Sequence, residues 1–355
     1  MNRLEISPRL LVAVQALLDR HGIASPREIT PLFGSGRSRL YRVRSSEGRL
    51  LLKQSAPSAE QPGDRLAAEY KFCQFLHRAG LRQAAEPIAW DEGEGLALYE
   101  HIDGRPLRRA EIGEPEIEAA LDFVHEINMQ RHGPDARELA LADEAAFSIS
   151  EHIRGVDRRV RLLHEIKPTN PSQHATRRFA RDELAATWKR TAESIESECV
   201  RIGIDLDASL APDRRVLSPG DLGFHNALRT RDGRIRFLDL ESAGWDDPAQ
   251  LIADFSDHPA FPISVTTFAA FRARVFSDFS SCEFELRRSE ILSPLFRTRR
   301  CCRVLEDFVA DSQLEKSLHG ARSDILASVN PLAAARLILN RTAPQPPTHP
   351  ALGRQ

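Results

Sequence analysis

The chain has 355 residues, of which 41% are hydrophobic and 28% are charged, as in ordinary globular proteins. Its 49 basic and 51 acidic residues give a formal net charge of -2, which excludes an overall field that would attract nucleic acid or an anionic membrane. No apolar run approaches the roughly 20 residues that cross a bilayer, so we expect a cytoplasmic protein. Five cysteines without C-x-x-C spacing indicate reduced thiols.

The first hundred residues predict strands with two helices. Residues 4–22 are amphipathic and predict a helix. The runs "LYRVRSSEGRLLLK" and "PIAWDEGEGLALYE" alternate around turn residues and predict two hairpins. Between them, "PGDRLAAEYKFCQFLHRAG" repeats apolar residues at the helical period and predicts a helix that stops at Gly80.

The remainder of the chain predicts helices with one interruption. The helical pattern runs from Glu114 to about Val200 and resumes to about Arg341. Between these parts, "NALRTRDGRIRFLDLE" predicts a hairpin, because Asp-Gly is a strong turn signal. We therefore predict an α+β protein with an N-terminal lobe at 1–100, a mainly helical lobe at 101–341 and a disordered proline-rich tail at 342–355.

Three features of the first hundred residues suggest phosphate binding. Gly34, Ser35 and Gly36 precede a strand, where small residues let backbone N–H groups approach phosphate oxygens. Lys53 ends an apolar strand, and Glu69 lies on the following helix, where its carboxylate is a candidate partner for the lysine ammonium. Each feature also has a structural interpretation: a hairpin turn, a strand end in water and a solvated glutamate.

The stretch "LSPGDLGFHNAL" suggests a second polar site. Asp221 and Asn226 are separated by four residues, and Asp239 follows the second strand of the predicted hairpin. The hairpin brings Asn226 close to Asp239, and amide and carboxylate oxygens are ligands that Mg²⁺ accepts. Asp221 would then remain to accept the proton of a hydroxyl group. Turn-capping Asx residues are the structural alternative.

Taken in order, these features resemble the aminoglycoside phosphotransferase and choline kinase family of phosphotransferases. The strongest similarity is in "SPGDLGFHNAL" and in "DGRIRFLDLESAGWDDPAQLIADF", and the order covers residues 33–255. The resemblance implies a two-lobed protein-kinase-like fold, with a small antiparallel sheet and one helix in the N-terminal lobe. It also implies transfer of the γ-phosphoryl group of ATP, or of GTP, to an alcohol with Mg²⁺.

The resemblance also implies residue roles. Asp221 matches the catalytic base, and Asn226 and Asp239 match the magnesium ligands. Lys53 and Glu69 match the phosphate-binding lysine and the glutamate that orients it. The nucleotide site further matches a loop over the triphosphate and a linker that receives adenine, at Gly34, Ser35, Gly36, Glu100, His101 and Ile102. One departure is Pro219, which stands where the family usually has histidine.

The acceptor is the least determined part of this prediction. Glu241 and Asp257 are candidates for binding an amino-sugar, an aminoglycoside or an amino-alcohol, whereas the arginines of "LFRTRRCCRVLEDF" would suit an anionic acceptor. We expect a small-molecule partner and neither nucleic acid nor membrane; the oligomeric state stays undetermined. Two other functions stay open: a nucleotide-binding protein without turnover, and a kinase-like enzyme that modifies protein.

Overall fold

The computed structural model describes residues 6–32, 38–46, 48–55, 63–256, 265–277, 282–314 and 330–342. The predicted glycine loop (Gly34, Ser35 and Gly36), Asp257 and the predicted tail beyond residue 342 lie outside these residues. The described chain divides into two compact units. Unit 1 contains the described residues up to 145 and residues 215–246, and unit 2 contains residues 146–214 and the described residues from 247 onward. The predicted lobe boundary at residue 100 stays a prediction.

Unit 1 is built on a five-stranded antiparallel sheet with the strand order β1-β2-β3-β5-β4. Its strands are β1 (Glu28–Leu32), β2 (Ser38–Arg44), β3 (Arg49–Ser55), β4 (Pro87–Asp91) and β5 (Leu96–Glu100). The β2–β3 and β4–β5 pairs confirm both predicted hairpins. Strand β1 was not predicted from the sequence.

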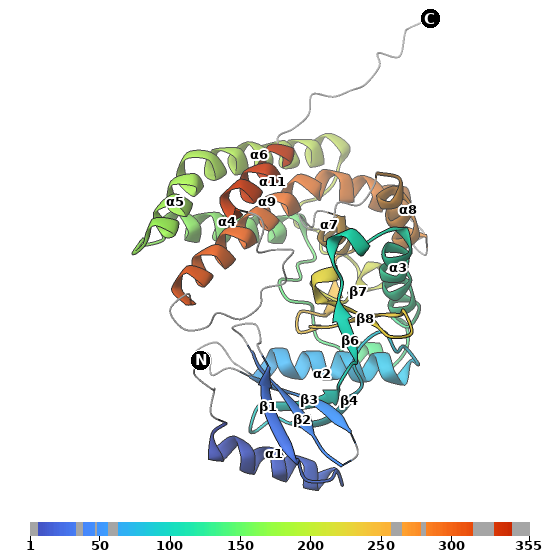
Figure 1. Ribbon diagram of the computed structural model, residues 1–355. Helices are drawn as coiled ribbons and strands as arrows, with labels where there is room; N and C mark the ends of the chain where they lie inside the picture. The colour runs from blue at the N-terminus through green and yellow to red at the C-terminus, as the bar shows by residue number, and fades with distance from the viewer. Residues whose placement is uncertain are drawn as a thin grey trace, which may run out of the picture. The chain divides into compact units, whose positions relative to one another are not determined.

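Two helices cover this sheet on opposite sides (Figure 1). Helix α1 (Pro8–Arg20) begins after Ser7, whose Oγ accepts a hydrogen bond from the Leu10 amide at 3.2 Å. Its apolar stripe packs on the sheet face that carries Val43, Leu52 and Leu98. Helix α2 (Gly63–Arg78) covers the other face, where the Tyr70 and Trp90 rings stack at 5.8 Å.

The alternation of side chains along the strands decides which residues meet which helix. Leu52 faces α1, so its neighbour Lys53 points to the opposite face, the one that α2 covers. Helix α2 ends before Gly80, which has a φ of 82°, as the sequence predicted.

The remainder of the described part of unit 1 contains one α-helix, three short helical turns and two small sheets. Helix α3 (Glu114–Met129) follows strand β6 (Gly104–Pro106) and the short helix η1 (Arg109–Glu111). Strands β6, β8 (Ala227–Thr230) and β9 (Ile235–Phe237) form an antiparallel sheet, and β7 (Val216–Ser218) pairs with β10 (Gly244–Asp246). Short helices η2 (Asp135–Glu138) and η5 (Phe224–Asn226) complete this unit. The β8–β9 pair, with Gly233 at a φ of 84°, confirms the predicted Asp-Gly hairpin.

The regular secondary structure in the described residues of unit 2 is entirely helical, with irregular segments between the helices. Its helices are α4 (Ile149–Glu165), α5 (Pro171–Phe179), a π-helical turn η3 (Ala180–Leu184), α6 (Ala185–Ile202), a short η4 (Pro212–Arg214), α7 (Pro248–Ser256), α8 (Val265–Phe276), α9 (Cys282–Leu314) and α11 (Pro331–Thr342). None of the helices in the described parts of either unit is long and apolar enough to span a membrane.

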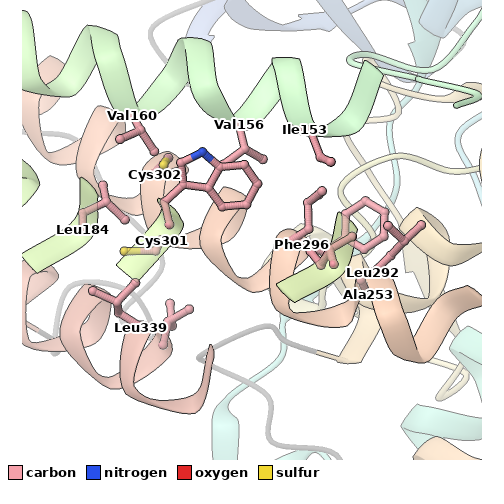
Figure 2. Packing of buried hydrophobic residues seen from close by; sticks show 14 of the residues in the cluster. Ile153, Val156, Val160, Leu184, Ala253, Leu292, Phe296, Cys301, Cys302 and Leu339 are labelled. Atoms are coloured by element: carbon pink, nitrogen blue, oxygen red, sulfur yellow. The ribbon is translucent and has the colours of Figure 1, made fainter. Parts of the chain in front are cut away.

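The core of unit 2 forms where α4, α6, α9 and α11 meet. Figure 2 shows Cys301 and Cys302 of α9 among Val160, Leu184 and Leu339, and neither thiol is paired in a disulfide. Burial raises the pKa of both thiols. The adjacent cysteines therefore act as small core residues, in agreement with their interpretation as reduced thiols.

Candidate functional site

Lys53 is the centre of a cluster of charged side chains in unit 1. Its Nζ atom lies 2.7 Å from Glu69 Oε2, 3.0 Å from Asp239 Oδ1 and 3.5 Å from Glu241 Oε2. The side chains of Lys53 and Glu69 are each 7% exposed, whereas that of Asp239 is 35% exposed. The cluster therefore has a buried ion pair on one side and an accessible carboxylate on the other.

The charges of this cluster determine its protonation. Burial alone would lower the pKa of Lys53, but the three carboxylates around it outweigh burial and hold that pKa above its ordinary value. Burial raises the pKa of Glu69, and the Lys53 ammonium opposes that rise. When ionised, the three carboxylates exceed the single ammonium by two negative charges. The cluster is thus suited to attract a cation.

The hairpin β8–β9 brings Asn226 beside Asp239, as the sequence predicted. The Leu238 amide donates a hydrogen bond to the Asn226 carbonyl oxygen at 2.7 Å, and Asp239 is the next residue. Asp239 has a φ of 59°, a left-handed conformation that costs a residue with a Cβ about 1–2 kcal/mol. Backbone strain of this kind is concentrated at functional sites.

Asp221 lies in the loop between β7 and η5, and its backbone is tied to Asn226. The Asn226 side-chain amide donates to the Asp221 carbonyl oxygen at 3.2 Å, so the two residues hold one loop conformation. The Asp221 side chain is 31% exposed, which leaves its carboxylate accessible to a ligand. The predicted group of Asp221, Asn226 and Asp239 therefore comes from one loop and one hairpin of the same unit.

Two residues that the sequence did not single out position this loop. The side chain of Asn128 on α3 donates to the Leu217 carbonyl oxygen and accepts from the Leu217 amide, both at 2.9 Å. Gly220 has a φ of 77°, and a Cβ there would lie 2.8 Å from the Ser242 carbonyl carbon. The loop around Pro219 is thus held by a buried amide and by a close backbone approach.

Two further side chains lie nearer to the site than expected. Glu241 was predicted only as a candidate for acceptor binding, yet its carboxylate faces the Lys53 ammonium and its side chain is 11% exposed. His225 Nε2 lies 3.3 Å from Asp221 Oδ2, a contact that the sequence analysis did not predict. The four-residue spacing of His225 and Asp221 was the available signal, because it allows a contact across one tight turn.

The predicted adenine linker follows β5. The Glu100 amide donates to the Glu86 carbonyl oxygen at 2.9 Å, and the Glu100 carboxylate accepts from Arg236 at 2.7 Å. Burial raises the pKa of Glu100, but the hydrogen bond and charge of Arg236 outweigh it and lower that pKa. Glu100 therefore anchors the linker, while His101 and Ile102 stay the predicted contacts for adenine.

Comparisons with known proteins show to which family the chain belongs. The model of the phosphotransferase enzyme family matches residues 29–290, which is more than half of the chain. No curated protein sequence matches the chain.

Among solved structures, the chain is similar to an ethanolamine kinase from Plasmodium vivax, with a TM-score of 0.58, 14% identity, and coverage of 95% of this chain and 89% of that chain. It is also similar to a choline kinase from Streptococcus pneumoniae, with a TM-score of 0.54, 15% identity, and coverage of 89% and 95%. A third is a spectinomycin phosphotransferase in complex with ADP and spectinomycin, with a TM-score of 0.57, 11% identity, and coverage of 94% and 99%. The chain therefore belongs to the phosphotransferase enzyme family, which confirms the protein-kinase-like fold and the classification as a small-molecule kinase that the motifs predicted.

Proposed function

We propose that this protein transfers the γ-phosphoryl group of ATP to a hydroxyl group of a small molecule, with Asp221 as the base. The observation that supports this most directly is the placement of Lys53 among Glu69, Asp239 and Glu241. A buried lysine held by one carboxylate and directed at another is suited to bind phosphate oxygens beside a metal ion.

The donor set near Lys53 fits Mg²⁺. Asp239 has an accessible carboxylate, and the side-chain amide of Asn226 donates through its nitrogen, which leaves its oxygen available as a ligand. These are the hard oxygen ligands that Mg²⁺ takes from proteins when phosphates and water complete its coordination. Bound there, Mg²⁺ would neutralise charge on the transferring phosphoryl group, and the two excess negative charges of the cluster favour a divalent ion.

In this proposal Asp221 acts as the general base. Its accessible carboxylate accepts the proton as the O–H bond of the acceptor breaks. The acceptor oxygen forms a bond to the γ-phosphorus while the bond from that phosphorus to the bridging β–γ oxygen breaks, and ADP leaves. No covalent enzyme intermediate is needed.

The similar structures suggest which nucleotide and which acceptors to test first. One similar structure is a complex with AMP, and another is a complex with ADP and spectinomycin. We therefore propose ATP as the donor, with GTP as the competing nucleotide to test. Ethanolamine, choline and spectinomycin belong to the names of similar proteins, so amino-alcohols, aminoglycosides and sugars are the first acceptors to screen.

The decisive test is a screen of hydroxyl compounds for magnesium-dependent ATP consumption, followed by Asp221→Asn on the best acceptor. This substitution retains the size of the side chain and removes the base, so we expect kcat to fall by about 10²- to 10⁴-fold. The Kd for ATP with Mg²⁺ should change little, because the proposed nucleotide and metal ligands remain.

Asp213→Asn is the matched control, since Asp213 is an exposed aspartate outside this site. It should retain wild-type kcat. If the wild type binds ATP but phosphorylates no acceptor, the nucleotide-binding function without turnover replaces this proposal. An Asp221→Asn variant with wild-type kcat would refute the assignment of the base.

A further inference from the structure

The Asp221 carboxylate contacts a histidine from the same loop. His225 Nε2 lies 3.3 Å from Asp221 Oδ2, and both residues belong to unit 1. An ionised carboxylate accepts hydrogen bonds and cannot donate them, so the imidazole nitrogen is the donor in this contact. One oxygen of the carboxylate is therefore held by a ring that comes from the next turn of the chain.

The backbone around Asp221 is fixed by hydrogen bonds on both sides. The Gly220 amide donates to Ser218 Oγ at 3.1 Å, and the Leu222 amide donates to the Gly220 carbonyl oxygen at 2.7 Å. The second of these bonds closes a three-residue turn with Asp221 at its centre. The Asn226 side chain donates to the Asp221 carbonyl oxygen at 3.2 Å. These bonds place the Asp221 backbone, but they do not determine the rotation of its side chain about χ1 and χ2.

The short helix η5 presents the imidazole to this side chain. The Asn226 backbone amide donates to the Gly223 carbonyl oxygen at 2.9 Å and closes the turn, and the buried Phe224 side chain anchors it. His225 and Asn226 are consecutive residues of this helix. One of them contacts the carboxylate of Asp221 and the other contacts its backbone, so a single turn restrains both parts of the residue.

The two partners differ in exposure. The His225 side chain is 13% exposed, whereas that of Asp221 is 31% exposed. Packing restricts the rotation of the more buried ring, and a ring restricted in this way can fix the orientation of the group that accepts its hydrogen bond. The histidine is thus the more restrained partner, and the carboxylate is the more accessible one.

Position 219 cannot give the same support. Pro219, where the family usually has histidine, has a hydrocarbon ring without a side-chain hydrogen-bond donor. In this chain the histidine of the loop follows Asp221 by four residues instead of preceding it by two. The support for the carboxylate therefore comes from the other side of the aspartate.

We propose that His225 is a positioning residue for phosphotransfer. It donates from Nε2 to Asp221 Oδ2 and holds the carboxylate in the orientation in which it accepts the proton of the acceptor hydroxyl. His225 keeps its own proton throughout. This inference rests on the proposed function, because it assigns a support to the proposed base. A base must lie within hydrogen-bond reach of the proton, and a misplacement of about 1 Å can lower the rate by about 10²-fold.

The first test replaces His225 with leucine, which is of similar size and has no donor. We expect kcat on the best acceptor from the screen to fall by about 10- to 100-fold, while the Kd for ATP with Mg²⁺ changes little. His225→Gln places an amide N–H near the position of Nε2 and should recover part of the lost kcat. The control is His132→Leu, which removes an exposed histidine of unit 1 and should retain wild-type kcat.

Combining His225→Leu with Asp221→Asn separates positioning from an independent role. The double variant should have the kcat of Asp221→Asn within about threefold, because no base remains for His225 to orient. A further fall of about tenfold would show that His225 acts without Asp221 and would overturn the inference. If His225→Leu retains wild-type kcat while Asp221→Asn loses it, the inference fails and the proposed function stands. If Asp221→Asn itself retains wild-type kcat, both fail.

The hydrogen bond can also be measured without turnover. Long-range ¹H–¹⁵N NMR spectra of the full-length protein with ¹⁵N-labelled histidine, recorded at pH 8, report which ring nitrogen carries the proton. The His225 signals are identified by their loss in His225→Gln. We expect a proton on Nε2 whose resonance shifts in Asp221→Ala. A ring with its proton on Nδ1 alone, or an Nε2–H resonance that is unchanged in Asp221→Ala, would contradict the proposed hydrogen bond.

Discussion

Replacing Lys53 with methionine tests whether the charged cluster is held by the lysine. Methionine retains much of the side-chain volume, so the main loss is the positive charge beside Glu69, whose carboxylate stays buried. Unit charges about 3 Å apart attract by about 5 kcal/mol at an effective dielectric constant of about 20. Breaking a buried ion pair from one side typically destabilises a protein by about 3–5 kcal/mol. We therefore expect the free energy of unfolding to fall by about 3 kcal/mol at pH 8.

The loss of unfolding free energy in Lys53→Met should depend on pH, because protonation neutralises the Glu69 carboxylate. Burial already raises the pKa of Glu69, and without the lysine ammonium that pKa rises further. A carboxyl group with a raised folded-state pKa destabilises the protein above its unfolded-state pKa, and this penalty disappears as pH falls below that value. The variant should therefore be much closer to the wild type at pH 4.5 than at pH 8.

The assay is urea unfolding followed by circular dichroism at several pH values. Lys71→Met, which removes an exposed lysine from α2, is the matched control and should match the wild type within about 0.5 kcal/mol. Adding Glu69→Gln to Lys53→Met should recover part of the loss, because the unpaired buried charge is then gone. A loss below about 1 kcal/mol at pH 8, or a loss that is equal at pH 4.5 and pH 8, would refute the reasoning.

Two further predictions concern the loop that carries Asp221. Asn128→Leu should lower the free energy of unfolding by about 2–4 kcal/mol in urea titrations, because the buried backbone amide and carbonyl of Leu217 then lack these partners. Asn128→Asp should lower the free energy of unfolding by less, because it keeps the oxygen that accepts from the Leu217 amide. Gly220→Ala should destabilise by about 2–3 kcal/mol and reduce kcat in the acceptor assay, since it adds a clash with Ser242 to an unfavourable φ. Gly80→Ala is its control, with a φ of 82° and open space around the added Cβ, and an equal loss in the two variants would contradict the clash.

The sequence was most informative where structure and chemistry are local. Both hairpins of the first hundred residues and the Asp-Gly hairpin were predicted, because alternation and turn residues act over a few neighbours. The close approach of Asn226 to Asp239 followed from the same hairpin. By contrast, β1, β6, β7 and β10 were not predicted, because short strands carry little periodic signal and form through partners distant in the chain.

The charged cluster shows what the tertiary structure alone decided. Lys53 and Asp239 are 186 residues apart, and only the packing of the sheet against the later hairpin brings their side chains within 3.0 Å. The same packing brings the Glu241 carboxylate to the Lys53 ammonium, although the sequence analysis had predicted that Glu241 binds the acceptor.

The loop that carries Asp221 and the arginines of α9 show the same difference between sequence and tertiary structure. The sequence placed Asp221 in a polar loop, but the support from Asn128 depends on a helix 89 residues earlier. The run of arginines in α9 looked uniform as a sequence, and the structure pairs two of them, Arg299 and Arg300, with Asp254 of α7. The physical reason is that residue types and periods determine local conformation, whereas the partner of a buried charge is determined by which elements pack together.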